Sequence, residues 1–349
     1  MPPRRRWIAI GLIVAAALGV RMFRSPANDT EPHDVRPDSA IVQSVAELAA
    51  NRSLRDGEPA GSEMAQMAAE EIARLEPELS RLEAQVQEGI LPPSPTDSRN
   101  SILELRGVHK AFGPKQVLRG VDVTVAPGQS LVIIGGSGTG KSVTIKSALG
   151  LLTPDKGEIF FDGAPVKSAK SIDNLRRRTG MLFQGGALFD SLTVWENVAF
   201  ALLYRDGVGR REAKKQAIEN LAKVRLPASA ADLRPAELSG GMQKRVALAR
   251  AIIAKPDLIF FDEPTTGLDP ITADAVNNLI VEQVKALGAA AVSITHDMAS
   301  ARKIADEVAM LHEGRIVWRG PVSALDNSGN PFIDQFVNGR ADGPIQPAI

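Results

Sequence analysis

The stretch GGSGTGKS, residues 135–142, constrains the fold of this chain more than any other part of its sequence. It fits the pattern G-x-x-x-x-G-K-[ST], and it lies between the apolar run LVII, typical of a buried strand, and SVTIKSALGLL, which predicts a helix. Glycine lets the backbone curl with its N–H groups pointing at a phosphate, and the helix N-terminus adds positive potential. The alternative is a glycine-rich turn without a ligand. The flanking strand and helix favour a phosphate-binding loop.

Strand and helix patterns alternate from residue 101 onward. ILELRGVHKAF, QSLVIIGG and DLIFFDEP predict strands, and their alternation with helices predicts an α/β fold with a largely parallel sheet. The first hundred residues contain arginine but no lysine, and LPPSPTDSRN at residues 91–100 is typical of a linker. We therefore expect one domain at residues 101–325 and a C-terminal tail at 326–349.

Two adjacent carboxylates follow the second apolar strand. In DLIFFDEP, residues 257–264, the strand would end at Asp262 and Glu263. By themselves they could cap a helix, but beside a phosphate loop they suit Mg²⁺ binding by Asp262 and activation of a water by Glu263. Lys141 would reach the β- and γ-phosphates, and the Ser142 hydroxyl would ligate Mg²⁺. The pattern predicts hydrolysis of a nucleoside triphosphate.

A third stretch, ELSGGMQKRVALARAI from Glu237, resembles the signature of ATP-binding cassette (ABC) ATPases. The resemblance covers about 225 residues with the family's motifs in order, and it implies a P-loop NTPase cassette with a helical signature subdomain. The sequence departs from the common LSGGQ at Met242. The resemblance adds four residues. Gln184 in MLFQGG would touch Mg²⁺ and link the site to a membrane partner, and His296 in SITHD would lie at the γ-phosphate. Asp269 in GLDP would be a dimer contact, and Phe112 would stack on adenine.

The resulting expectations divide by role. Catalysis falls to Lys141, Glu263 and His296, and Mg²⁺ binding to Ser142, Gln184 and Asp262. The expected nucleotide contacts are Phe112, Gly135, Gly136, Ser137, Gly138, Thr139, Gly140, Lys141, Ser142, Thr144 and Gln184. In this family two subunits lie head to tail around two Mg·ATP, which implies a homodimer or a second ATPase chain. The signature residues that would reach the ATP of the other subunit are Ser239, Gly240, Gly241 and Gln243.

Two further stretches bear on the cargo. RRRTGMLFQGGALFDSLTVWENVAF, residues 176–200, and the tail sequence FVNGRADGPIQP resemble the ATPase subunit of the Mla phospholipid-transport system and its mammalian-cell-entry relatives. The resemblance implies an integral-membrane permease, a lipid-binding substrate partner, and a peripheral position on the cytoplasmic face of the inner membrane. The alternatives are a polar amino-acid importer and a ribosome-associated ATPase. Because 41 basic residues balance 41 acidic ones, no nucleic-acid partner is expected.

The first hundred residues fall into three predicted parts. Residues 1–24 hold an apolar run of 14 residues from Trp7 to Val20, whereas a spanning helix needs about 20. A short anchor, a signal-like segment and an extension without a role all stay open, although an ATP site favours the interior of the cell. Residues 25–60 predict a flexible linker.

Residues 61–100 predict an amphipathic helical extension. The stretch 61–106 resembles the N-terminal helical domain of bacterial class I peptide chain release factors, although the Gly-Gly-Gln tripeptide of those factors is absent. A solvated helix packed on a neighbour is the alternative.

Overall fold

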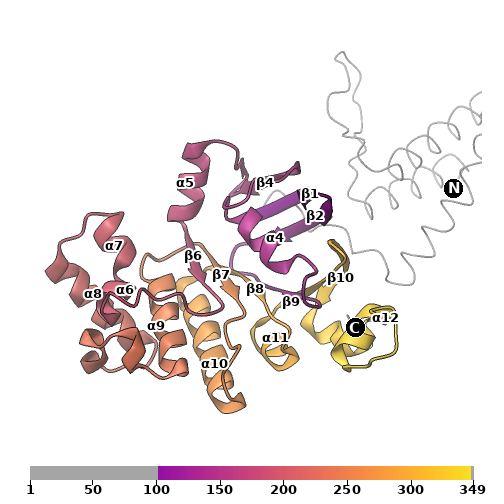
Figure 1. The fold of residues 1–349 in the computed structure, drawn as a ribbon. Helices are drawn as coiled ribbons and strands as arrows, with labels where there is room; N and C mark the ends of the chain where they lie inside the picture. Colours follow the sequence, from indigo (N-terminus) through magenta and orange to yellow (C-terminus); the bar gives the residue numbers. More distant parts are fainter. Residues whose placement is uncertain (1–100, 347–349) are drawn as a thin grey trace, which may run out of the picture. The chain divides into compact units, whose positions relative to one another are not determined.

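The computed structural model describes residues 101–346, in which two β-sheets and a group of helices can be followed in Figure 1. The predicted segments 1–24, 25–60 and 61–100 lie outside the described residues. Between residues 101 and 346, no helix combines the length and the apolar character needed to cross a membrane.

The larger sheet has six strands in the order β10-β9-β3-β8-β7-β6. Its inner pairings, from β9 to β6, are parallel, and β10 pairs antiparallel with β9. The prediction of an α/β fold with a largely parallel sheet is confirmed. The strands are β3 (Ser130–Ile134), β6 (Thr179–Leu182), β7 (Leu258–Asp262), β8 (Ala290–Ile294), β9 (Glu307–His312) and β10 (Arg315–Pro321).

This sheet is buried on both faces. Val132 and Ile134 of β3 enter one apolar cluster, while Leu131 and Ile133 enter the other. Successive side chains of a strand point to opposite faces, so an unbroken apolar run such as LVII suits a strand covered on both sides. The sheet is therefore a rigid platform from whose edge the loops carrying the polar residues emerge.

A second sheet of four antiparallel strands, in the order β2-β1-β4-β5, was not predicted. The strand predicted at ILELRGVHKAF is β1, but it turns back at Gly113, where φ is +58°, and pairs with its neighbour in the chain. A tight turn of this kind gives an antiparallel pair, whereas a parallel neighbour would require a longer crossover. The strands are β1 (Leu103–Phe112), β2 (Lys115–Val125), β4 (Lys156–Phe161) and β5 (Ala164–Pro165).

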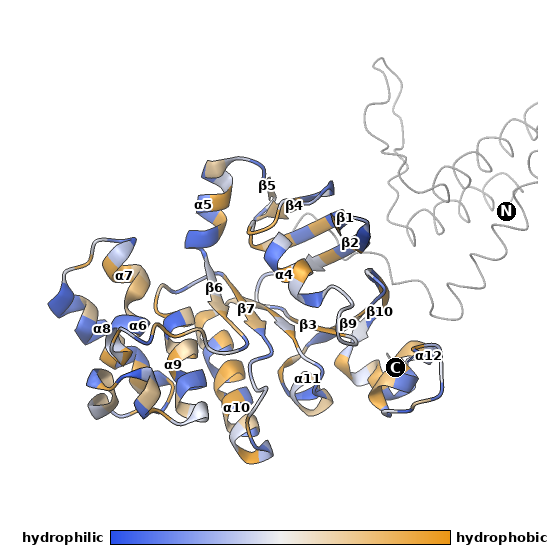
Figure 2. Ribbon diagram, viewed as in Figure 1, coloured by the Kyte–Doolittle hydropathy of each residue, from blue (hydrophilic) through white to orange (hydrophobic). Residues whose placement is uncertain are grey.

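The segment between β6 and β7 is helical and matches the predicted helical subdomain. On its longest helix, Ala213, Ala217, Leu221 and the following Val224 are fully buried at three- and four-residue steps, so one face packs inward. Figure 2 shows the alternation of apolar and polar residues on these helices. They are α6 (Val194–Val198), α7 (Phe200–Tyr204), α8 (Arg210–Lys223), the 3-10 helices η2 (Ala228–Asp232) and η3 (Pro235–Glu237), and α9 (Gly240–Ile252).

The remaining helices connect the strands and close the chain. They are α4 (Lys141–Ala148), α5 (Ala169–Arg177), α10 (Pro270–Leu287), α11 (Met298–Ile304), the 3-10 helix η4 (Val322–Asn327) and α12 (Pro331–Val337). The predicted domain end at residue 325 falls within η4. Beyond it, Ile333 is fully buried in the core, and the Gln335 side chain accepts from the Ile345 N–H at 2.7 Å. The chain is thus fastened to the domain as far as residue 345.

Candidate functional site

The glycine loop joins β3 to α4, and its backbone could not hold other residues at two positions. Gly135 has φ +149°, and a Cβ there would lie 2.2 Å from the Leu311 carbonyl oxygen. Gly140 has φ +109°, and its Cβ would lie 2.8 Å from Leu118 Cδ2. Both conformations favour glycine, and both approaches are too close for a side chain. The loop therefore keeps its shape because it is packed against the domain.

Lys141 is buried at the start of α4, and its ammonium is held by the loop. Its Nζ donates to the carbonyl oxygens of Gly135, at 2.7 Å, and Gly136, at 2.8 Å. Burial lowers the pKa of Lys141, and the nearby carboxylates Glu263 and Asp262 only partly oppose this. No side chain caps α4, so the N–H groups of its first turn could bond an anion. Loop and lysine together form a cradle for phosphate.

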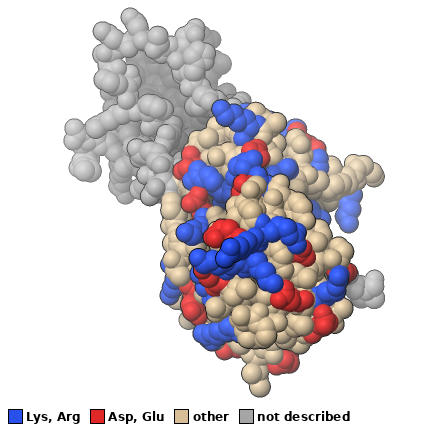
Figure 3. Space-filling view, turned by 90° about the vertical axis from the view of Figure 1, so that its left-hand side faces the viewer, with Lys and Arg blue, Asp and Glu red and all other residues tan. Residues whose placement is uncertain are grey.

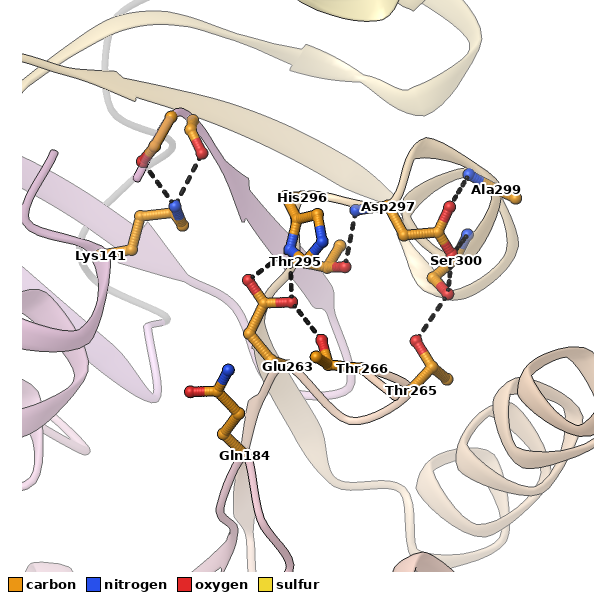
Figure 4. Close-up of polar contacts among 12 residues, drawn as sticks. Lys141, Gln184, Glu263, Thr265, Thr266, Thr295, His296, Asp297, Ala299 and Ser300 are labelled. Atoms are coloured by element: carbon orange, nitrogen blue, oxygen red, sulfur yellow. Dashed lines mark hydrogen bonds and ion pairs between the residues drawn. The ribbon is translucent and has the colours of Figure 1, made fainter. Parts of the chain in front are cut away.

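Glu263 and His296, predicted from motifs 33 residues apart, are in direct contact. The His296 Nδ1 lies 2.9 Å from Oε1 and 2.8 Å from Oε2 of Glu263 (Figure 4). The hydroxyl of Thr266 donates to the same carboxylate at 2.8 Å. Glu263 follows β7 and His296 follows β8, which are adjacent parallel strands, so their carboxyl ends bring the two residues together. This arrangement orients the carboxylate of Glu263 at a largely buried position.

Asp262 carries the second carboxylate. Burial and the neighbouring Glu263 raise its pKa, against the attraction of Lys146, Lys141 and Lys244. A carboxylate that is buried beside another one, as Asp262 is, favours a cation nearby. Within residues 101–346, no group of three His, Cys, Asp or Glu side chains could hold a metal by itself. A divalent cation here would also need hydroxyl, amide or phosphate oxygens, and Ser142 and Gln184 could supply the first two.

Lys244 is a member of this site that the sequence did not reveal. It reaches from α9 and is buried, and its Nζ donates to the backbone carbonyl of Gln184 and, at 3.3 Å, to that of Glu263. Burial lowers its pKa. In the sequence it belongs to the basic run QKR, where a lysine is expected to face solvent. Only the packing of α9 against the loop after β6 turns it inward and places Gln184 close to Glu263.

The predicted signature residues lie at the start of α9, where Ser239 and Gln243 make hydrogen bonds within the chain. Ser239 is the N-cap of α9, where its hydroxyl accepts from the Met242 N–H at 3.3 Å. The Gln243 amide donates to the carbonyls of Pro235, at 3.0 Å, and Leu238. Gly240 and Gly241 form the first turn. Figure 1 draws α9 and α4 in different parts of the domain, so the fold does not bring the signature to the phosphate loop of the same chain.

Three other predicted residues lie at the start of α10, at the end of β1 and within α4. Asp269 caps α10 and accepts from the N–H groups of Ile271 and Thr272 at 3.1 and 3.0 Å. Phe112, at the end of β1, is 48% exposed. Thr144 is buried in α4, and its hydroxyl donates to the Gly140 carbonyl at 3.1 Å. The exposure of Phe112 leaves its ring accessible to a ligand.

Two family models match the chain. One, for the ABC transporter family, matches residues 118–266. The other, for the PCRF domain, matches residues 34–109 and overlaps the segment compared above with release factors. Nearly all of that second match lies outside the described residues.

Several curated proteins are similar to this chain. MlaF of Escherichia coli K12, an ATP-binding protein of an intermembrane phospholipid transport system, is 39% identical over 247 residues, which are 70% of this chain and 91% of MlaF. The chloroplast protein TRIGALACTOSYLDIACYLGLYCEROL 3 of Arabidopsis thaliana is 40% identical over 264 residues, which are 70% of this chain and 76% of that protein. The probable ribonucleotide transport ATP-binding protein mkl of Mycobacterium tuberculosis H37Rv is 39% identical over 245 residues, which are 70% of this chain and 68% of mkl.

Among solved structures, the dimeric ATP-binding cassette MJ0796 with ADP and phosphate superposes with a TM-score of 0.58 and 30% identity. The match covers 63% of this chain and 98% of MJ0796.

Proposed function

The chain belongs to the ABC transporter family and is an ATPase, and on that premise we propose that it powers a membrane permease that moves phospholipid. The single observation that carries the proposal is the contact of His296 with Glu263 at the carboxyl edge of the parallel sheet, where the Glu263 carboxylate also attracts the Lys141 ammonium. The choice of phospholipid is supported by the similarity to MlaF and by the stretch at residues 176–200. The name of mkl, a ribonucleotide transport protein, makes a nucleotide the competing cargo.

The proposed chemistry assigns one task to each side chain. Lys141, fixed by two carbonyls, meets the β- and γ-phosphates of ATP. Glu263 accepts a proton from the water that attacks the γ-phosphorus, and ADP leaves as the bond to its β-phosphate oxygen breaks. His296 contacts Glu263 through Nδ1, and as an imidazolium, in which both ring nitrogens carry a proton, it would also donate from Nε2 to the γ-phosphate. Phe112 would stack on the adenine.

Ser142, Gln184 and Asp262 would hold Mg²⁺. When bound, Mg²⁺ neutralises negative charge on the β- and γ-phosphates. Burial and then the neighbouring Glu263 raise the pKa of Asp262, which supports a cation at this position because a positive charge would stabilise the ionised carboxylate.

We further propose that two copies assemble head to tail. The dimeric structure of the similar cassette MJ0796 supports this assembly. Ser239, Gly240 and Gly241 of each copy would then bond the ATP held by the other. Asp269 would contact the partner copy. Each site would be complete only in the dimer, so ATP would hold the two subunits together and its hydrolysis would release them.

The helical subdomain carries an exposed aromatic cluster that supports contact with a permease. The rings of Phe189 and Phe200 stack at 4.6 Å, and Tyr204, 62% exposed, lies 4.7 Å from Phe200. Large exposed aromatics mark partner surfaces. The face shown in Figure 3 carries both basic and acidic residues. On the helical subdomain, Arg210 pairs with Glu196. The proposed position is peripheral, at the cytoplasmic face of the membrane where ATP is available, and no nucleic-acid partner is proposed because 41 basic residues balance 41 acidic ones.

The test is affinity purification of the Glu263→Gln protein with ATP from gently solubilised native membranes, followed by mass spectrometry of proteins and lipids. Copurification of a permease, a substrate-binding partner and phospholipid supports the proposal. Copurification of a permease without lipid would instead indicate that the cargo is a soluble solute such as an amino acid or a ribonucleotide. Ribosomal proteins without a permease would overturn transport, and the PCRF-domain match would then become the observation to follow.

A further inference from the structure

A cluster of buried polar side chains lies behind His296, on the side away from Lys141 in Figure 4. At its centre is Ser300 in the first turn of α11, which is fully buried. Its hydroxyl oxygen lies 2.6 Å from Asp297 Oδ2, 3.1 Å from Thr265 Oγ1 and 2.8 Å from Asn277 Nδ2. Thr265 and Asn277 are themselves only 6% and 3% exposed.

The directions of these hydrogen bonds follow from the groups involved. A carboxylate only accepts, so Ser300 donates its single proton to Asp297. The Thr265 hydroxyl must then donate to Ser300, as the Asn277 amide does. The Ser300 oxygen therefore donates once and accepts twice, which uses its full capacity. Removing this hydroxyl would take a hydrogen bond from the buried Thr265 and Asn277 and from the half-buried Asp297 at once.

The cluster joins segments that carry the two ends of the contact between Glu263 and His296. Thr265 precedes Thr266, whose hydroxyl donates to Glu263, and Asp297 follows His296. Asn277 ties both to the middle of α10. The Asp297 carboxylate also caps α11 by accepting from the N–H groups of Ala299 and Ser300 at 3.0 and 3.1 Å. A shift of either loop would therefore have to break the bonds at Ser300.

We propose that Ser300 is a positioning residue for ATP hydrolysis, because its hydroxyl locks the loop after Glu263 to the segment that carries His296. The inference rests on the proposed roles of those two residues. Ser300 acts only through its neighbours: it fixes the distance between the His296 imidazole and the Glu263 carboxylate. Small displacements of a catalytic group lower the rate of the chemical step more than they lower substrate affinity.

The chain offers a matched control in Ser293. This serine of β8 is also fully buried and lies three residues before His296, but within residues 101–346 its hydroxyl has no hydrogen-bond partner. Ser293→Ala and Ser300→Ala therefore remove the same atom at equal burial and differ in the bonds that are lost. Both are made in the full chain and assayed for ATP hydrolysis over a range of ATP concentrations.

We expect Ser300→Ala to lower kcat by about tenfold while KM changes by less than about twofold, since the misplaced groups act in the chemical step. Ser293→Ala should keep both constants within about twofold of the wild type. A second readout is the NMR signal of the His296 ring nitrogens. The chain has only four histidines, so this signal can be assigned. It should shift in Ser300→Ala and stay in place in Ser293→Ala.

Thr265→Val protects the test against a variant that fails to fold. It keeps the side-chain shape and removes one donor to Ser300, so kcat should fall in the same direction with KM maintained. Ser300→Ala and Thr265→Val proteins that hydrolyse ATP like Ser293→Ala would overturn the proposal. Glu263→Gln, run in parallel, separates the two levels: if it hydrolyses ATP normally, the proposed role of Glu263 fails, whereas if it is inactive and Ser300→Ala is fully active, only the role of Ser300 fails.

Discussion

At Glu263 the backbone adopts φ +51°, a conformation that residues other than glycine rarely take. The residue is buried, and Thr266 and His296 both bond its carboxylate. Such strain persists only where the surroundings hold it, and it is concentrated at functional positions. The chain therefore keeps a carboxylate here despite a cost in stability.

Replacing Glu263 by glutamine should separate binding from hydrolysis. An amide keeps the size of the side chain but cannot accept the proton of a water, so kcat should fall by about 10²- to 10³-fold with ATP still bound. Steady-state hydrolysis and equilibrium binding of ATP measure the two effects. Glu282→Gln, at a half-exposed residue that pairs with Arg225, is the matched control and should change neither. Normal turnover by the Glu263→Gln protein would remove Glu263 from the mechanism.

The phosphate loop allows a second prediction at this scale. Gly135→Ala places a Cβ 2.2 Å from a backbone oxygen and should lower the free energy of unfolding by more than about 3 kcal/mol, if the protein folds at all. At Gly113, φ is also positive, but the space around it is open, so Gly113→Ala should cost only about 1 kcal/mol. Urea denaturation measures both. Equal losses would mean that the strained φ, rather than the close approach to Leu311, sets the cost.

Among the elements, the short helices of the helical subdomain depend on their caps. The helix α6 has five residues, and Thr193 and Glu196 form a capping box at its start. Glu196 accepts from the Thr193 N–H at 3.0 Å and from Arg210 Nη2 at 2.6 Å. A helix this short gains little from its own hydrogen bonds. The cap and the ion pair to α8 therefore fix where it begins.

A pH-dependent loss of stability should follow from Glu196→Gln. The Thr193 N–H and then Arg210 lower the pKa of Glu196, so its ionised form stabilises the folded state above its ordinary pKa. The variant should lose about 1 kcal/mol of unfolding free energy at pH 7. The deficit should shrink as the pH falls through the lowered pKa, because the wild type then loses the same interaction. Thermal unfolding at several pH values measures it, and a deficit that persists in acid would assign the effect to packing.

For the whole molecule, the separation of α4 and α9 bears on the proposed assembly. If each ATP needs Lys141 from one copy and the signature from the other, two inactive proteins should complement each other. Lys141→Ala removes the phosphate-loop lysine. Gly240→Asp adds a negative charge to the signature, and a Cβ fits at this exposed position because its nearest neighbour, Leu268 Cδ2, lies 3.5 Å away.

Each variant alone should be inactive, and an equal mixture should recover about a quarter of the wild-type rate, since half of the dimers are mixed and each has one intact site. ATP hydrolysis before and after mixing measures it, with analytical ultracentrifugation to establish that dimers form. Mixed dimers without any activity would show that the signature acts within its own chain or that one intact site does not suffice.

The sequence by itself determined the parts of this protein whose chemistry lies in contiguous residues: the glycine loop between a strand and a helix, the apolar strand that ends in Asp262 and Glu263, and the parallel sheet. Each depends on local backbone freedom or on the alternation of side chains along one strand. Only the tertiary structure decided which distant residues meet: the pairing of His296 with Glu263, the inward turn of Lys244 toward Gln184 60 residues away, the cluster around Ser300, and the second, antiparallel sheet. Those contacts arise because two apolar layers close on both faces of one sheet, and no local pattern specifies how they close.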